Sequence, residues 1–555
     1  MRISLARSKT KIQEPPITPT VPSPPTKKEL AAQKRKAASD RSAFIAAAAQ
    51  AIGIGAVLGG IGFAVGGDKA GLGGFVATVI LLLSSQYPRQ AIWAFLMFLP
   101  ISGTVTYSVG GGSPLFQLAK DAFYIPALFG FYKYCQRERV PFLLPKKFLP
   151  WVYALLGYCV LVIAAVNATQ ASAPGEKPIL LGLLGLKVFM GYIPLITCAY
   201  YLIRSKKEFL FLTRSHVIFA IVCCALCFIQ YSMLQSGRCE GTRNLVGADL
   251  FKANLDARCF VGGSLAFSPQ VNMIRLPGTF VSPWHWAWFM ISNAFFTFAT
   301  AFSDPSPLWR IMGLGGMASV FVCAVISGQR IALILVPIIT VILLVLTGQL
   351  TNLKRFIPIA IGLAILLGGA MTMYPDVVQE RWDSTVSRWN ASPPTEFIAA
   401  QAAHTADRTT LLGGGLGRAT NSARTFGKTT LIETWFPKIL YEVGWPGLIL
   451  FLLMVTALTV LTFKAYRSVR DRNFRSFGAC FWVFILIISY QTYWYPLDTD
   501  PVAIYYWFFA GVLLRLPEID KRESLEADIL AQQAEQNSKK KRGKKKGKAK
   551  TRKRR

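Results

Sequence analysis

The chain has 555 residues, of which 53% are hydrophobic and 16% charged, and its formal net charge is +33. A soluble domain carries roughly 25% charged residues, so this composition argues against a water-soluble globular protein. Only three histidines are present, which excludes a histidine-rich metal centre.

The two ends of the chain are polar and strongly basic. Residues 1–42 contain ten Lys or Arg residues and the Pro-rich stretch PPITPTVPSPP, and 13 of the 17 residues from Lys539 to Arg555 are Lys or Arg. Such segments cannot bury enough apolar surface to fold, so residues 1–42 and 517–555 are predicted to be disordered tails, with a short amphipathic helix on the membrane surface as the alternative for 517–536. Because both tails adjoin apolar runs, we expect them to bind anionic membrane lipids rather than nucleic acid.

Between the tails, residues 43–516 are predicted to form a polytopic, all-α integral membrane domain. A helix needs about 20 apolar residues to cross the hydrocarbon core of a bilayer. Fourteen runs approach this length, the second and fourth being the weakest, which predicts a bundle of about 14 transmembrane helices, with 12–14 as the range. The runs lie at approximately 43–66, 70–86, 91–108, 114–132, 148–167, 179–203, 213–233, 284–303, 311–328, 331–348, 356–373, 441–463, 476–494 and 502–516.

The charges between these runs predict the topology. Lys and Arg are enriched in the cytoplasmic connections of membrane proteins. Short connections such as VGGGSP contain neither, whereas both accumulate at 133–147, 204–207, 354–355 and 464–475. This alternation places both termini in the cytoplasm and two long loops, 234–283 and 374–440, on the outer face.

The outer loops contain two further features. Cys239 and Cys259 lie in the first loop, where an oxidising compartment lets them form a disulfide; the alternative is two independent buried thiols. The second loop contains GGGLG at 413–417, which lacks the Lys of a phosphate-binding loop and is interpreted as a tight turn that permits close backbone approach. No metal site or cofactor is predicted, because the other cysteines lie in or beside apolar runs without His or acidic neighbours at ligand spacing.

Three charged residues are expected at the outer membrane surface: Arg275, Arg330 and Glu433. Charges so close to hydrocarbon are costly unless they are paired or functional, although each of these residues alone could be an interfacial anchor. Guanidinium groups bind phosphate oxygens bidentately, and a carboxylate can accept a proton from a hydroxyl nucleophile. Together, these groups suit transfer of a sugar from a lipid-linked pyrophosphate.

The order of the motifs resembles the O-antigen ligase and O-antigen polymerase superfamily of bacterial envelope glycosyltransferases. The chain has R-x-P-G-T-F-x-S-P before one run, S-G-Q-R between two runs, then GGGLG, and E-x-x-x-x-K-I-L-Y-E-V-G-W-P-G-L at a late run. The resemblance implies the membrane fold of lipid-sugar-dependent glycosyltransferases. It also implies glycan transfer from an undecaprenyl-pyrophosphate-linked oligosaccharide to a glycan or lipid acceptor, at the periplasmic face of the bacterial inner membrane and without metal or nucleotide.

By the same resemblance, Arg275 and Arg330 would bind the pyrophosphate, with Lys187 as a further basic residue, and Glu433 would activate the acceptor hydroxyl. Related ligases have a His at the position of Glu433, so the chain departs from the ligase pattern and is compatible with a polymerase. His404, in the same loop, is a second candidate for the base.

Two other functional classes stay open from the sequence. A multi-span transporter of an anion such as bicarbonate, or of a lipid-linked sugar, would also contain charges in its membrane domain. A scaffold for a polysaccharide assembly complex would use the tails and leave the outer loops without chemistry.

Overall fold

The computed structural model of the chain describes residues 27–112, 116, 119–142, 145–170, 173–271, 273–348, 361, 368, 372 and 375–552. The chain divides into two compact units. The larger unit is Ala51–Arg522, and it contains the site considered below. The smaller unit is Met1–Gln50 together with Glu523–Arg555, and its described residues belong to the N-terminal part of one long helix and the C-terminal part of a second.

The fold is all-α, apart from one two-stranded antiparallel sheet of β1 (Ala266–Ser268) and β2 (Met273–Arg275). The longer helices are α1 (Lys27–Gln86), α2 (Pro88–Phe98), α5 (Ala119–Arg137), α6 (Leu149–Val162), α7 (Pro178–Met190), α8 (Leu195–Leu202), α9 (Lys206–Gln235), α10 (Pro283–Ser303), α11 (Pro307–Ile326), α12 (Arg330–Leu346), α14 (Pro375–Ala391), α15 (Pro394–Ala406), α16 (Trp435–Ser468), α17 (Arg472–Tyr490) and α18 (Val502–Arg552).

Nine helices in the described part of the chain are long and apolar enough to cross a membrane, which agrees with the predicted polytopic helical membrane protein. They are Ala38–Gln86, Pro88–Val109, Leu149–Asn167, Pro178–Leu202, Lys206–Gln235, Pro307–Ile326, Trp435–Ser468, Arg472–Tyr490 and Val502–Glu535. The predicted run at 356–373 falls almost entirely outside the described residues.

Helix α1 accounts for two of the predicted runs because it turns back on itself at Gly67, whose φ of 72° departs from helical geometry. Small residues let the halves on either side of this turn approach closely. A Cβ placed on Gly59 would lie 2.8 Å from the Cβ of Phe75, and one on Gly62 would lie 2.8 Å from the carbonyl oxygen of Ala70. Residues 51–86 therefore form an antiparallel helical hairpin.

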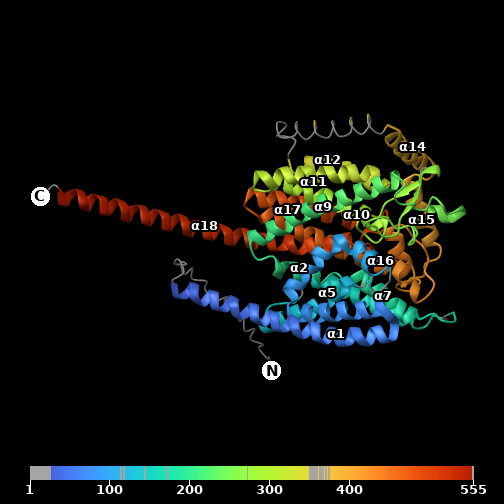
Figure 1. Cartoon of the computed structure of the whole chain (residues 1–555), viewed down its shortest axis with the longest axis horizontal. Helices are drawn as coiled ribbons and strands as arrows, with labels where there is room; N and C mark the ends of the chain where they lie inside the picture. Colours follow the sequence, from blue (N-terminus) through green and yellow to red (C-terminus); the bar gives the residue numbers. More distant parts are fainter. Residues whose placement is uncertain are drawn as a thin grey trace, which may run out of the picture. The chain divides into compact units, whose positions relative to one another are not determined.

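Helix α10 is the centre of the bundle, and α9, α11, α12 and α17 pack side by side around it (Figure 1). Almost every side chain from Trp286 to Ala301 is buried, including several Phe and Trp rings. The hydroxyls of Thr297 and Thr300 and the side-chain N–H of Asn293 donate hydrogen bonds to carbonyl oxygens one turn earlier in the same helix, whereas the side-chain oxygen of Asn293 is buried without a partner among the described residues.

The basic connections meet at one end of the bundle. The Tyr201 hydroxyl donates to the Pro141 carbonyl oxygen at 2.9 Å, and the Arg522 guanidinium donates to the Arg204 carbonyl oxygen at 3.2 Å. The Asp520 carboxylate accepts hydrogen bonds from two backbone N–H groups of the 469–471 connection. The predicted basic connections 133–147, 204–207 and 464–475 therefore lie together, whereas 354–355 lies outside the described residues.

The two long loops lie together as well, and they share one cavity, described below. The second loop is held against the 173–176 connection, where Glu176 accepts a hydrogen bond from the Lys428 N–H at 2.8 Å and pairs with Arg418 at 3.4 Å. The hydrogen bond from Lys428, together with Arg418, holds the pKa of the Glu176 carboxyl below its ordinary value. The loop predicted at 374–440 is not irregular throughout, because it contains α14 and α15 and overlaps the start of α16.

The structure differs from the sequence prediction at the chain ends. Helix α1 begins at Lys27 and α18 continues to Arg552, within segments expected to be disordered. Both segments are rich in Ala, Lys, Glu and Gln, which have high intrinsic helix propensity even where no core is available. Residues 1–26 and 553–555, which belong to the same predicted tails, lie outside the described residues.

Candidate functional site

A cavity of about 710 Å³ lies where the two long loops meet the ends of the helices. It is lined by β2, the start of α10, the turn between α11 and α12, and the segments before α16 and after α17. Arg275, Arg330 and Glu433, which the sequence places 55 and 103 residues apart, all line this cavity. The structure therefore brings together the three charged residues on which the sequence analysis relied.

Arg275 is the last residue of β2 and pairs in register with Ala266 of β1. The next residue, Leu276, donates its N–H to the carbonyl oxygen of Ser327 at 3.1 Å. This bond joins the end of β2 to the turn that begins the S-G-Q-R segment. The first long loop is thereby attached to the α11–α12 turn through its backbone.

The α11–α12 turn approaches β2 so closely that its glycine is required. Gly328 has a φ of +68°, and a Cβ placed on it would lie 1.9 Å from the carbonyl oxygen of Ile274. Any side chain there would separate the turn from the strand. Since Arg330 begins α12 directly after this turn, the close approach places Arg330 and Arg275, both with exposed side chains, on the same side of the cavity.

Glu433 is held in place by backbone contacts on both sides. The Trp494 N–H donates to the Glu433 carbonyl oxygen at 3.0 Å, and the neighbouring Thr434 forms an isolated antiparallel bridge with Tyr493. The Glu433 N–H donates to the Gln401 side-chain oxygen at 3.4 Å, which connects the residue to α15. None of these bonds uses the Glu433 carboxylate, which stays available to the cavity.

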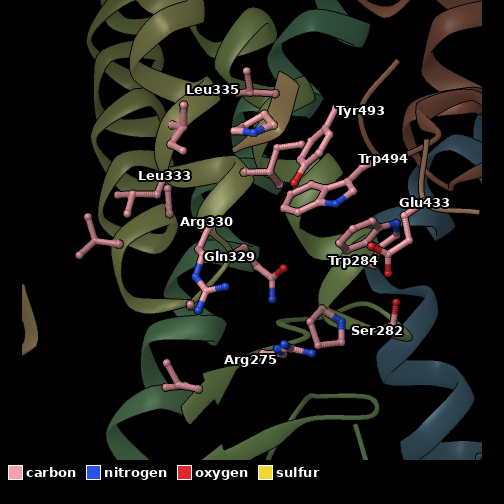
Figure 2. Close-up of a pocket in the computed structure, with 18 of the residues that line it drawn as sticks. Arg275, Ser282, Trp284, Gln329, Arg330, Leu333, Leu335, Glu433, Tyr493 and Trp494 are labelled. Atoms are coloured by element: carbon pink, nitrogen blue, oxygen red, sulfur yellow. The ribbon is translucent and has the colours of Figure 1, made fainter. Parts of the chain in front are cut away.

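Figure 2 shows how the labelled side chains divide around the cavity. Arg275, Arg330 and Gln329 lie on one side. Glu433 and Trp284 lie on the other, with the Glu433 carboxylate directed toward the cavity and toward Ser282. The cavity therefore has a cationic side and a side that combines a carboxylate with aromatic rings.

Tyr493 and Trp494 were not predicted as site residues, whereas Trp284 belongs to the segment WHWAW, whose aromatic side chains are suited by type either to stacking on sugar rings or to lining the membrane interface. Trp284 and Trp494 have ring centroids 4.5 Å apart, and Tyr493 stacks on Trp494 at 4.8 Å. All three line the cavity. The sequence signal for Tyr493 and Trp494 is the aromatic run YQTYWYP at 490–496, most of which falls within the predicted apolar run 476–494, where the sequence predicted no chemistry.

A third part of the lining is apolar. It comes from the end of α11 and the first turns of α12, and it consists of Ala324, Val325, Ile331, Leu333, Ile334 and Leu335. These residues belong to apolar helices, so the cavity combines the charged and aromatic side chains of the loops with an apolar surface formed by the helices. An amphipathic ligand matches this combination.

Lys187 and His404 do not line this cavity. Lys187, in α7, pairs with Asp121 of α5 at a distance of 2.9 Å, so its charge has a structural partner. His404 is exposed in the last turn of α15. The structure therefore separates both residues from the three that it brings together.

A second group of charges lies beneath the second loop. Lys438 of α16 pairs with Asp498, and the two side chains are 3% and 6% exposed. Burial raises the pKa of the Asp498 carboxyl, and the charge of Lys438 opposes this shift. The buried Glu442 carboxylate accepts hydrogen bonds from the Ala419 N–H at 2.7 Å and from the Thr420 hydroxyl at 3.0 Å. This group fixes the loop to α16.

The Gly-rich segment 413–417 forms the predicted tight turn. Gly413, Gly415 and Gly417 all have positive φ, and the Gly414 N–H donates to the Tyr441 carbonyl oxygen at 2.7 Å. The segment packs against α7 and α16 and does not line the large cavity. Its role in the structure is close backbone packing.

The structure also contains the predicted disulfide between Cys239 and Cys259, whose Cα atoms are 5.7 Å apart. The remaining eight cysteines are buried, including Cys223, Cys224 and Cys227 of α9. Within the described residues, no group of three or more His, Cys, Asp or Glu side chains is placed to hold a metal ion.

The fold and the cavity define a class: an α-helical protein with several apolar helices of membrane-spanning length and a cavity with cationic, aromatic and apolar sides at the helix ends. No protein-family model matches the sequence, and a comparison with curated proteins found no match.

Proposed function

We propose that the chain is a glycosyltransferase that transfers or polymerises glycan from an undecaprenyl-pyrophosphate-linked donor during synthesis of an envelope polysaccharide. The observation that carries the proposal is that Arg275, Arg330 and Glu433 line one cavity. Two guanidinium groups on one side and a carboxylate on the other match a reaction in which a diphosphate leaves and a hydroxyl loses its proton.

In the proposed reaction, the acceptor hydroxyl attacks the anomeric carbon of the donor sugar, and Glu433 accepts the proton of that hydroxyl. A new carbon–oxygen bond forms as the bond between the anomeric carbon and the pyrophosphate oxygen breaks. Arg275 and Arg330 stabilise the negative charge that develops on the departing diphosphate. The apolar side of the cavity, formed by α11 and α12, would receive the first isoprene units of the lipid.

We place the chain in the bacterial inner membrane, with about 14 spans, both termini in the cytoplasm, and the cavity on the periplasmic face. Support comes from the nine apolar helices, the hairpin at Gly67, and the gathering of basic connections at the end of the bundle away from the long loops. Labelling of Ser236→Cys and Ser422→Cys tests this orientation, in a background in which Cys239 and Cys259 are kept. Access to either thiol only from the cytoplasm would contradict it.

The basic tails are proposed to bind anionic lipid head groups beside the membrane domain. Their 13 basic residues from Lys539 to Arg555 provide the charge, and this attraction is screened by salt. Sedimentation of the full chain in nanodiscs with vesicles containing phosphatidylglycerol, at low and high salt, tests this partner.

The activity is tested with purified full-length chain and lipid-linked donor in vesicles. Arg275→Ala and Arg330→Ala are expected to abolish glycan transfer, and the corresponding Lys variants to retain part of it, because an ammonium loses the bidentate geometry. Glu433→Gln is expected to reduce the rate roughly 10²- to 10⁴-fold, as does loss of a general base in other enzymes.

Matched controls are Arg238→Ala and Glu240→Gln, which change exposed residues of the first long loop outside the cavity lining. Both are expected to leave transfer unchanged. Normal transfer by Glu433→Gln and by either Arg→Ala variant would contradict the proposed site. Partial activity of Glu433→His would support a base at this position, since related ligases have His there.

A transporter is the second candidate, and the charged residues of α5 and α7 favour it. However, Lys187 pairs with Asp121, and Lys120 pairs with Asp500, so these charges have partners within the fold. The cavity charges, by contrast, lie at helix ends rather than along a path through the bundle. Uptake of bicarbonate or of a lipid-linked sugar into vesicles, without glycan product, would favour the transporter.

A further inference from the structure

The aromatic side of the cavity contains groups that bind sugars rather than lipid chains. Trp284, Tyr493 and Trp494 present ring faces or edges, and the polar side chains of Ser282 and Gln491 also line the cavity. A pyranose ring has an apolar C–H face and hydroxyl groups around its edge, so it can cover an indole ring while its hydroxyls form hydrogen bonds.

The backbone at Trp494 supports a functional role for this ring. Trp494 has a φ of +62°, in the left-handed region that a bulky residue rarely adopts. Such a conformation persists only where the surrounding structure enforces it, and it occurs preferentially at functional sites. Here the bond from the Trp494 N–H to the Glu433 carbonyl oxygen and the bridge between Thr434 and Tyr493 enforce it.

The same backbone contacts couple the ring of Trp494 to the carboxylate of Glu433. Residues 433–435 and 492–494 are joined by the bond at Glu433 and by a second bond from the Trp435 N–H to the Thr492 carbonyl oxygen. A ligand placed by Trp494 is therefore placed relative to Glu433. In Figure 2 the ring of Trp284 lies beside the Glu433 carboxylate.

We propose that Trp284 and Trp494 form a platform for the first sugar of the lipid-linked donor, holding its anomeric carbon between the arginines and Glu433. The proposal rests on the proposed function and names its sugar subsite. An isoprenoid chain would cover the Glu433 carboxylate without offering it a hydrogen-bond donor, whereas the α11–α12 side offers such a chain an apolar surface. The platform residues position the substrate and take no part in proton transfer.

The test is equilibrium binding to the full-length chain in nanodiscs, with two probes: bare undecaprenyl pyrophosphate, and the same lipid bearing one hexose. Wild type is expected to bind the hexose-bearing lipid more tightly. Trp494→Ala is expected to weaken that binding roughly tenfold, which corresponds to about 1.4 kcal/mol, and to leave binding of the bare lipid unchanged, because the variant removes only the ring face that the hexose covers. Trp284→Ala is expected to act in the same direction.

Two further variants separate ring stacking from packing. Trp494→Phe keeps an aromatic face and is expected to retain part of the preference, whereas Trp494→Leu keeps apolar bulk and is expected to lose it. Trp151→Ala, at an exposed site on α6 outside the cavity, is the matched control and is expected to bind both lipids like wild type.

The outcomes distinguish this inference from the proposed function. Equal affinity of wild type for both lipids would overturn the platform and leave pyrophosphate binding in place. Loss of binding of both lipids in Trp494→Leu would also overturn the platform, because it would assign Trp494 to packing. Failure of wild type to bind either lipid would overturn the proposed function itself. In Arg330→Ala, both lipids are expected to bind weakly, because that variant changes the pyrophosphate subsite.

Discussion

Replacing Lys438 by Met should destabilise the chain because it leaves the Asp498 carboxylate buried without its ion-pair partner. The two side chains are only 3% and 6% exposed, and the pair joins α16 to the segment that follows α17. Removing one member of a buried ion pair costs about 3–5 kcal/mol, so K438M is expected to lose unfolding free energy in this range, and D498L likewise. The double variant K438M/D498L is expected to lose less free energy than the two single variants added together, because neither member of the pair is then left buried without its partner.

The assay is unfolding by SDS titration in mixed micelles, read for all four members of the double-mutant cycle. The exposed pair of Lys252 and Asp249, 70% and 69% accessible, is the matched control and is expected to contribute no more than about 1 kcal/mol. Losses at Lys438 and Asp498 that add within about 0.5 kcal/mol would refute the coupling. The buried pair would then have no energetic role in holding the 491–498 segment.

Three other predictions follow from the fold. Replacing both cysteines of the disulfide (C239S, C259S) is expected to lower stability by about 3 kcal/mol in the chain-entropy model of a loop of this size. Melting curves of the purified variant and of oxidised wild type check this loss, and reduced wild type is expected to melt like the variant. Because the pKa of the Glu176 carboxyl is lowered in the folded chain, this carboxylate stabilises the fold at any pH above its ordinary pKa. The stabilisation is lost as the pH falls through the lowered pKa. Protection of residues 418–428 from protease is therefore expected to be equal at pH 7 and pH 5 and to fall only in stronger acid. Gly328→Ala is expected to cost more than about 1 kcal/mol and to reduce transfer, and unchanged melting of this variant would contradict the close approach to β2.

The sequence predicted those features that depend on local pattern and on which face of the membrane domain a segment was assigned to. Apolar runs predicted most of the membrane helices, since each helix must satisfy its own backbone in lipid. Arg275, Arg330 and Glu433 were selected because each was predicted near the outer end of an apolar run, and helix ends on one face share a small part of the molecular surface. The convergence of these three in one cavity follows from that shared location.

The features that were missed depend on pairings between distant segments. The approach of Trp494 to Glu433 rests on an isolated bridge of one residue pair and a few backbone bonds, which leave no periodic pattern in the sequence. Lys187 was grouped with the arginines because the family resemblance implies a basic residue in an earlier span, but its partner Asp121 lies 66 residues earlier, in another helix. Hydropathy alone cannot reveal such a partner.

In this cavity, the frame, meaning the backbone contacts that fix the positions of Arg275, Arg330 and Glu433, is distinct from the side-chain groups that are proposed to react. Glu433 is located by its own backbone N–H and carbonyl oxygen, and Arg275 by the register of β2 and the bond from Leu276. Arg330 is located by the glycine turn before it. Because the described bonds that locate these residues involve the backbone or neighbouring residues, a change of side chain at position 433 leaves the frame intact. The exchange of Glu for His at that position therefore tests the proton acceptor itself, and a loss of activity in Glu433→Gln can be assigned to chemistry once its melting curve matches that of wild type.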